Sequence, residues 1–273
     1  MSGREFGSDA LLEMLAGVPL AGRERSMKIS RAGLLTDRLL LGFLATPAAW
    51  SRFVELARAF SMPSAWEAQV AALLRQSDHL HVGLETDGAR RWCKVYLEFN
   101  RNLAAARRQA RPPGVPLLLY LAFKWDTARP REGGISRYFC HVDLPPADML
   151  ERVQRIHGVS PSPVCDMVCS ALQAGAGKAS PPMYLEVRED GNPRSSYDIN
   201  LYGSGLRLVD VAPRLQAVAG SLGLGWELTS FLGPLGERRL GHLSAGRDRH
   251  GDEFLSVYYP MDDANDARVR DVH

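Results

Sequence analysis

Apolar and polar residues alternate along several short stretches of the chain, and the clearest stretch runs from Cys93 to Phe99. A period of two is typical of a β-strand with two different faces. One face carries Val95, Leu97 and Phe99, and the other carries Lys94, Tyr96 and Glu98. A cation, an aromatic ring and a carboxylate in a row are unusual for a strand face that only meets water. The pattern therefore predicts a strand whose polar face has a chemical role.

Pairs of such alternating stretches predict four β-hairpins. Asp87-Gly88 and Asp190-Gly191 are turn signals between the two strands of a pair, and later turns are also rich in Gly and Pro. The predicted strand pairs are 79–85 with 92–99, 117–126 with 136–144, 183–188 with 197–202, and 240–246 with 253–259.

Between the hairpins, apolar residues recur at helical spacing. Thr46 is a suitable cap for a helix that has Pro47 at its first position. The apolar run Leu34–Leu44 is also predicted to be helical, whereas residues 17–31 are expected to form a loop. The remaining predicted helices are 8–16, 47–60, 63–75, 100–111, 147–157, 164–174 and 210–222.

Hairpins therefore alternate with one or two helices, at a period of roughly fifty to sixty residues. Hairpins joined by helices give antiparallel strands, unlike βα units, which build parallel sheets. The chain contains no GxGxxG motif after a strand and no GxxxxGK[ST] motif. These observations exclude the usual nucleotide-binding α/β folds and predict an antiparallel α+β protein.

The helices need an apolar surface to cover, so they are expected to pack on the apolar strand faces. The polar faces then point away from the helices. In an open sheet these faces only meet solvent, but if eight or more strands close, they line a polar lumen. The residues concerned are His79, His81, Glu85, Lys94, Tyr96, Glu98, Tyr120, Lys124, Asp126, Arg137, His141, Tyr184, Glu186, Arg188, Asp198, Asn200, Tyr202, His242, Ser244, Ser256 and Tyr258.

Such a lumen suits the ionisation of an allylic diphosphate. Lys and Arg side chains hold a multiply charged anion. Tyrosine rings stabilise a carbocation by cation–π attraction, and a carboxylate can take a proton from an acceptor. This combination in a water-shielded space predicts transfer of a prenyl group.

Short motifs on these strands resemble those of the ABBA-type prenyltransferases, which include bacterial aromatic and cyanobactin-type peptide enzymes. Lys94-Val95-Tyr96 and Asn200-Leu201-Tyr202 match a Lys-x-Tyr or Asn-x-Tyr pattern, and Arg239-Leu240 and Tyr258-Tyr259 resemble two later positions. The resemblance covers about residues 78–260. It implies an antiparallel β-barrel of αββα repeats inside a ring of helices. The whole chain, 1–273, would be one domain, with an N-terminal helical portion over 1–77 and a polar tail over 261–273.

The resemblance also implies roles for particular residues. Glu85 would be the acceptor-side base, with Glu186 in reserve. The diphosphate would be bound by Lys94, Lys124, Arg137, Asn200 and Arg239, and the cation would be shielded by Tyr96, Tyr184, Tyr202 and Tyr258. The family usually has five hairpins, so a fifth would lie within residues 18–45. A lysine often present on the last barrel strand is replaced here by Phe254 or a neighbour.

Composition and charge change this interpretation little. The 273 residues carry a formal net charge of +2, which implies no nucleic-acid partner. The four cysteines are not spaced as a zinc site and are expected to be core thiols. No signal peptide or membrane span is evident, so a soluble cytoplasmic protein is expected. His79 and His81 lack a third metal ligand, and Asp262-Asp263-Ala264-Asn265-Asp266, although it matches DDxxD, is expected to be an exposed tail.

The sequence thus supports two functions. The first is transfer of a dimethylallyl or geranyl group from its diphosphate to an aromatic small molecule or a peptide side chain, with Mg²⁺ accompanying the diphosphate if any metal takes part. The second is a non-catalytic barrel that binds an apolar or anionic metabolite. Stabilisation by prenyl diphosphates, compared with inorganic diphosphate and the free alcohol, would distinguish them.

Overall fold

The computed structural model describes residues 8–109, 112–158, 160–178 and 180–261. Its strands form one antiparallel sheet in the order β11-β10-β9-β8-β7-β6-β5-β4-β3-β1-β2, and β11 also pairs with β1. This pairing closes ten strands into a barrel, while the short β2 pairs with the end of β1. The strands are β1 Gly22–Ser30, β2 Gly33–Leu35, β3 Arg38–Leu44, β4 His79–Asp87, β5 Arg90–Glu98, β6 Pro116–Asp126, β7 Gly133–His141, β8 Met183–Glu189, β9 Ser195–Asn200, β10 His242–Arg247 and β11 Glu253–Pro260.

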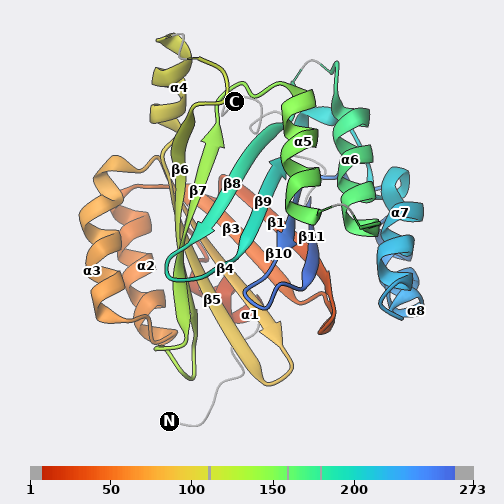
Figure 1. Cartoon of the computed structure of the whole chain (residues 1–273). Coiled ribbons are helices and arrows are strands. Elements are labelled where there is room, and N and C mark those ends of the chain that lie inside the picture. The colour runs from red at the N-terminus through yellow and green to blue at the C-terminus, as the bar shows by residue number, and fades with distance from the viewer. Residues whose placement is uncertain (1–7, 110–111, 159, 179, 262–273) are drawn as a thin grey trace.

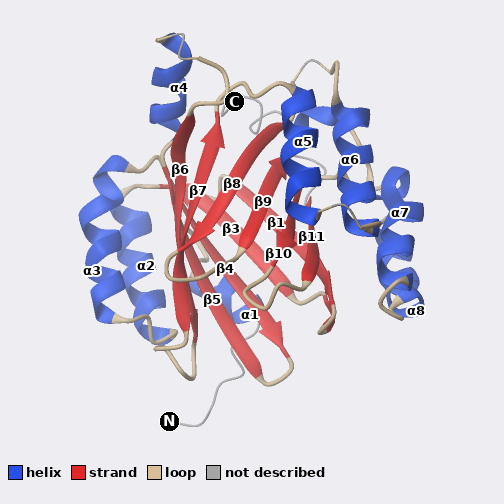
Figure 2. Cartoon of the chain, viewed as in Figure 1, coloured by secondary structure: helices blue, strands red, loops and turns tan. Residues whose placement is uncertain are grey.

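Helices surround the barrel, and the predicted closed αββα barrel is confirmed (Figures 1 and 2). One group, α2 and α3, lies on one side, and α5 to α8 lie on the other. The helices are α1 Ser8–Met14, α2 Pro47–Ala59, α3 Ser64–Leu73, α4 Asn100–Arg108, α5 Pro146–His157, α6 Pro163–Gly175, α7 Leu208–Gly220 and α8 Gly225–Leu232. Of these, α8 was not predicted from the sequence.

Three apolar cores lie between the barrel and its helices, and the smallest joins Leu103 and Ala106 of α4 to Leu119, Cys140 and Leu185. Of the other two, the first joins α1 to α3 to the outward side chains of β3 to β6, such as Val82, Val95 and Phe123. The second joins α5 to α8 to β1 and β8 to β11, for example through Ile199 and Val257. The hydrophobic effect therefore fixes which strand face points outward, and the alternating polar residues are left to face the barrel interior.

Helix α2 begins as the sequence predicts. The Thr46 hydroxyl accepts a hydrogen bond from the backbone N–H of Ala49 at 3.2 Å, and Pro47 occupies the first turn. Phe53 and Leu56, one turn apart, are fully buried against the barrel. Burial of each such side chain contributes about 1.5–3 kcal/mol, so packing adds to the cap in holding the helix.

The prediction for residues 17–44 was wrong in its secondary structure. The stretch expected as a loop and a helix forms β1, β2 and β3, so the N-terminal portion is not only helical. Leu39, Leu41 and Phe43 face the outer core. Leu40 lies between them and faces inward, but it is apolar too, so the stretch does not show alternating apolar and polar residues. Gly42 is glycine because His81 fills the space beside it: a Cβ there would lie 2.7 Å from His81 Nδ1. These strands are the fifth hairpin, in the segment where the resemblance placed it.

Candidate active site

Strand register brings the polar side chains of neighbouring strands onto the inner face of the barrel. Cross-strand partners share a face of a sheet. Lys94 of β5 lies opposite Gly83 of β4 and Lys124 of β6, and Glu98 lies opposite His79 and Tyr120. Since their alternating neighbours pack in the outer core, these side chains point into the interior, here called the lumen.

One end of the lumen holds a cation cluster, which consists of Lys28, Arg38, Lys94 and Lys124 around the carboxylate of Glu85. Glu85 is 5% exposed. Arg38 Nε donates to Glu85 Oε2 at 3.2 Å, Lys124 Nζ donates to Glu85 Oε1 at 3.2 Å, and Lys94 forms a further ion pair with Oε2. Four basic side chains surround one carboxylate, so an anionic ligand would meet an excess of cationic groups, although burial lowers the pKa values of Lys28, Lys94 and Lys124 while the ligand is absent.

The charges of this cluster shift one another's proton affinities. Burial alone would raise the pKa of Glu85, but Lys124, Lys94 and Arg38 together lower it well below its usual value. Glu85 is therefore ionised and poorly suited to accept a proton. Burial and the neighbouring Lys124 lower the pKa of Lys28 to about 8, so this lysine loses its charge more readily than an exposed one.

The pKa of Lys28 leads to a pH prediction for anion binding. As pH rises through about 8, Lys28 becomes neutral and one cation is lost, so the Kd of inorganic diphosphate should rise by up to about tenfold between pH 7 and pH 9. Isothermal titration calorimetry at several pH values measures this change. Lys28→Arg should reduce the dependence, since arginine remains charged; burial also lowers the pKa values of Lys94 and Lys124, which account for the remainder. An equally steep pH dependence in Lys28→Arg would show that Lys28 is not its source.

Four tyrosines lie along the lumen from the cation cluster towards the opposite end. Tyr96 and Tyr120 each pack edge-on against Tyr138, with ring centroids 5.9 Å apart. The Arg38 guanidinium donates to the Tyr258 hydroxyl at 3.2 Å, and the Tyr258 ring stacks on His242 at 3.9 Å. These rings, here called the tyrosine group, connect the two charged ends of the lumen.

The opposite end, here called the acidic end, contains the carboxylates of Glu24, Glu98 and Asp198. His242 lies between two of them, with Nδ1 3.0 Å from Asp198 and Nε2 3.2 Å from Glu24 Oε2. Tyr202 donates to the other oxygen of Glu24. Burial disfavours a charged imidazole, yet Asp198 and Glu24 raise the pKa of His242 well above its usual value, so His242 is protonated.

Glu98 is held by a second set of partners. His81 Nε2 lies 2.7 Å from its Oε2, while Asn100 and Tyr120 donate to its Oε1 at 2.8 and 2.9 Å. Although burial would raise the pKa of Glu98, the hydrogen bonds from His81 and Tyr120 help to lower it. The acidic end thus carries ionised carboxylates directly across the tyrosine group from the cations.

Five residues predicted to line the lumen lie outside it: Arg137, His141, Tyr184, Glu186 and Arg188. Tyr184 is buried in the outer core, where its ring stacks on Tyr197 at 5.8 Å. Glu186 accepts from His141 and Arg188 on the same outer face, and the His141 hydrogen bond lowers its pKa to about 2. Arg137 pairs with Asp190 near the surface. Since adjacent side chains alternate, inward-facing Tyr138 and Val187 leave these five outside.

Two other predicted diphosphate ligands lie at the acidic end. Asn200 pairs in register with His242, and its Oδ1 accepts from the Tyr202 backbone N–H at 3.1 Å. Arg239 precedes β10 in the sequence, and its guanidinium donates to the Tyr202 carbonyl at 2.9 Å. Among the predicted site residues, the structure therefore brings together Glu85, Lys94 and Lys124 at one end, and Asn200, Tyr202 and Arg239 at the other, with Tyr96 and Tyr258 between them.

Sequence reasoning missed several lumen residues. Lys28, Arg38 and Glu24 all lie on the hairpin that was not recognised, and Tyr138 was passed over on β7. The alternation of Glu24, Ser26 and Lys28 with Arg25, Met27 and Ile29 was a usable signal for a strand with a charged face. That signal would have placed a carboxylate and a lysine in the lumen.

Metal ligands and cysteines are a separate matter from the charged groups of the lumen. Within the described ranges, no group of three His, Cys, Asp or Glu side chains is placed to hold a metal ion. The cysteines are free thiols; Cys93 and Cys140 are buried, whereas Cys165 and Cys169 are partly buried against the core and lie 3.8 Å apart on α6. The DDxxD match at 262–266 lies outside the described residues. Participation of Mg²⁺ with a diphosphate stays a prediction.

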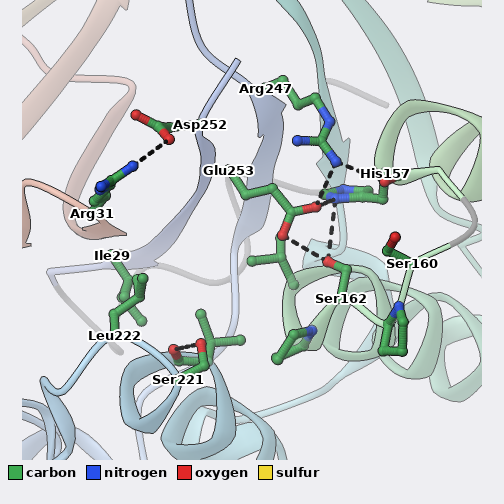
Figure 3. Close-up of a pocket in the computed structure, with 14 residues that line it drawn as sticks. Ile29, Arg31, His157, Ser160, Ser162, Ser221, Leu222, Arg247, Asp252 and Glu253 are labelled. Atoms are coloured by element: carbon green, nitrogen blue, oxygen red, sulfur yellow. Dashed lines mark hydrogen bonds and ion pairs between the residues drawn. The ribbon is translucent and has the colours of Figure 1, made fainter. Parts of the chain in front are cut away.

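A polar cavity of about 280 Å³ lies outside the barrel, between the α5–α6 connection and the β10–β11 turn (Figure 3). There the Nδ1 of the buried His157 lies 2.6 Å from Glu253 and 3.4 Å from the Ser162 hydroxyl, and its Nε2 lies 2.8 Å from the Tyr197 hydroxyl. In a nucleophilic triad, serine and carboxylate contact opposite nitrogens of the histidine. Here both are at Nδ1, so the group fixes the α5–α6 connection to the barrel and does not activate Ser162.

The closed antiparallel barrel with helices outside it has the ABBA-type prenyltransferase fold. Solved structures with this fold are similar over most of the chain. The 5-dimethylallyl tryptophan synthase of Streptomyces coelicolor, in complex with DMASPP and Trp, has a TM-score of 0.66 at 18% identity and covers 93% of this chain and 87% of its own. The prenyltransferase PriB, in a binary complex with product diphosphate, has a TM-score of 0.57 at 16% identity and covers 92% and 88%.

A further solved structure, a 6-dimethylallyl tryptophan synthase, has a TM-score of 0.54 at 17% identity and covers 87% of this chain and 80% of its own. No protein-family model and no curated protein sequence matches the chain. The resemblance found in the sequence is thus confirmed as a similarity of fold. Along the described part of the chain, no helix is long and apolar enough to cross a membrane.

Proposed function

We propose that the protein transfers a prenyl group from an allylic diphosphate, dimethylallyl or geranyl, to an electron-rich aromatic acceptor, either a small molecule or a side chain of a peptide. The observation that carries this proposal is the order of groups along the lumen. Cations lie at one end, carboxylates at the other, and tyrosine rings between them. This order matches the charges of the proposed reaction: the negative diphosphate that leaves, the positive allylic cation, and the proton that the acceptor loses.

In the proposed reaction the allylic C–O bond breaks and the diphosphate leaves with the bonding electrons. Lys28, Arg38, Lys94 and Lys124 stabilise the leaving anion, which carries more charge on its departing oxygen than the bound substrate does. The faces of Tyr96, Tyr138 and Tyr258 shield the allylic cation, each by about 0.5–2 kcal/mol when water is excluded. The acceptor ring then forms the new bond to carbon.

The acceptor must finally lose a proton, and Glu24 is the better-placed base. Glu85 lies among the cations, where the diphosphate would bind, and its pKa is lowered well below the usual value. Three of the lone pairs of Glu98 are already used by His81, Asn100 and Tyr120, whereas Glu24 has one partner on each oxygen. Glu24 therefore has lone pairs that remain free to accept the proton. Its contact with His242, which in turn contacts Asp198, can distribute the charge of that proton.

The solved structures support this proposal by what they contain. One neighbour is described in complex with DMASPP and Trp, and another with product diphosphate. These ligands are bound by proteins that are only 16–18% identical to this chain. The proposal for this chain therefore rests on its own lumen residues.

The test is stabilisation and turnover with candidate donors. Dimethylallyl or geranyl diphosphate should raise the melting temperature more than inorganic diphosphate or the corresponding alcohol does. Only a prenyl diphosphate can contact both the cation cluster, through its diphosphate, and the tyrosine group, through its prenyl chain. Mass spectrometry with indole and phenol acceptors should then detect the added prenyl group. A protein stabilised by none of these diphosphates would be a binding protein for another ligand, which is the alternative function.

A further inference from the structure

The charges at the acidic end indicate what kind of acceptor the lumen takes, provided that the proposed function holds. The ionisable groups that face this end are Glu24, His79, His81, Glu98, Tyr120, Tyr138, Asp198, Tyr202, Arg239, His242 and Tyr258, with Arg38 on the far side of Tyr258. Three of them are carboxylates. The protonated His242 and Arg239, which contacts the Tyr202 carbonyl, balance two of these, so one negative charge is left for a ligand to neutralise.

A second observation at the same end points to a missing hydrogen-bond donor. His79 is buried, with 8% of its surface exposed, and its Nδ1 makes no hydrogen bond to any described residue. The nearest carboxylate oxygen is Glu98 Oε2, at 3.6 Å, and this oxygen has only His81 as a hydrogen-bond donor. Burial lowers the pKa of His79, so its ring is neutral, and in the Nε2–H tautomer its Nδ1 can accept a hydrogen bond from a ligand N–H. An unsatisfied buried polar atom is costly, and a ligand N–H would relieve that cost.

We propose that the acceptor is an aromatic compound that carries a protonated amine and no carboxylate. Its ring would lie against the tyrosine group, near the allylic carbon. Its ammonium would lie among Glu24, Glu98 and Asp198, where its N–H groups meet carboxylate oxygens. An acceptor carboxylate at this position would instead face three like charges, and its burial there would be opposed by both desolvation and repulsion.

The test is a binding series in which the charge of the side chain on indole changes from positive to neutral to negative. Tryptamine, N-acetyltryptamine and indole-3-propionate are cationic, neutral and anionic. Calorimetry is run with the full chain and saturating inorganic diphosphate, so that the carboxylate cannot bind to the cation cluster. Tryptamine should bind at least tenfold more tightly than N-acetyltryptamine, and indole-3-propionate should bind most weakly. Equal affinities, or preference for the propionate, would overturn the inference.

Variants assign the effect to the acidic end. Glu98→Gln keeps groups that can bond to Tyr120 and Asn100 but removes a charge, so the preference for tryptamine over N-acetyltryptamine should fall to threefold or less. Glu151→Gln removes an exposed acid on α5 and should leave the preference unchanged. An unchanged preference in Glu98→Gln, with the protein folded by circular dichroism, would count against the site.

Failure of this inference can be separated from failure of the proposed function. If prenyl diphosphates stabilise the protein and a neutral indole is prenylated, but the amine is not preferred, only the acceptor class is wrong. If no prenyl diphosphate binds and no indole is modified, the proposed function fails, and a tryptamine preference in calorimetry would then indicate an amine-binding barrel.

Discussion

Replacement of Lys94 by alanine is expected to reduce kcat/KM for the prenyl diphosphate by about 100- to 1,000-fold, the usual cost of losing one group that stabilises transition-state charge. Lys94 lies at the centre of the cation cluster, opposite Lys124 in the sheet and ion-paired with Glu85. Its side chain is 13% exposed, so water cannot readily replace the lost group. Steady-state kinetics with varied donor measures the loss.

The variant should still fold, because Glu85 keeps Arg38 and Lys124 as partners. Circular dichroism and denaturant unfolding check this point. Lys178→Ala, which removes an exposed lysine outside the lumen, is the matched control and should keep wild-type kinetics. Turnover within threefold of wild type in Lys94→Ala would remove the cation cluster from the proposed donor site.

The period of two predicted most of the barrel because the outer face of most strands is uniformly apolar. In β4 and β5 the inward residues other than Trp92 are polar or glycine, and the outward residues Leu80, Val82, Leu84, Cys93, Val95 and Leu97 pack under helices, so the alternation is visible without a structure. In β3, Leu40 faces inward and breaks the pattern, and an apolar run of that length is equally typical of a buried helix. Only the pairing of β3 with β1 and β4 decides between the two.

The candidate site was predicted less well than the fold, because pairing between distant strands creates it. Arg38 meets Ser256 and Tyr258 across more than two hundred residues of sequence, through closure of the barrel by β1 and β11. Arg137 and Tyr184 carry suitable side chains, but the residue chosen on each strand was one position off the inner face. A shift of one residue moves a side chain to the other side of a sheet.

A comparison of Glu24→Gln with Glu85→Gln identifies the base. With saturating donor, Glu24→Gln should lower kcat by about 100- to 10,000-fold, the range for loss of a general base, and leave donor affinity within about twofold.

Glu85→Gln should keep kcat within about tenfold, because Glu85 lies at the diphosphate end. It should lower the free energy of unfolding, by about 3–5 kcal/mol, since buried cations lose their shared partner. The pKa of Glu24 lies below its usual value because His242 and Tyr202 outweigh the effect of burial, so wild-type kcat should stay level from pH 7 down to about pH 5. A larger fall of kcat in Glu85→Gln than in Glu24→Gln would return the role of base to Glu85, where the sequence first suggested it, and would mean that the acceptor enters the lumen beside the cations.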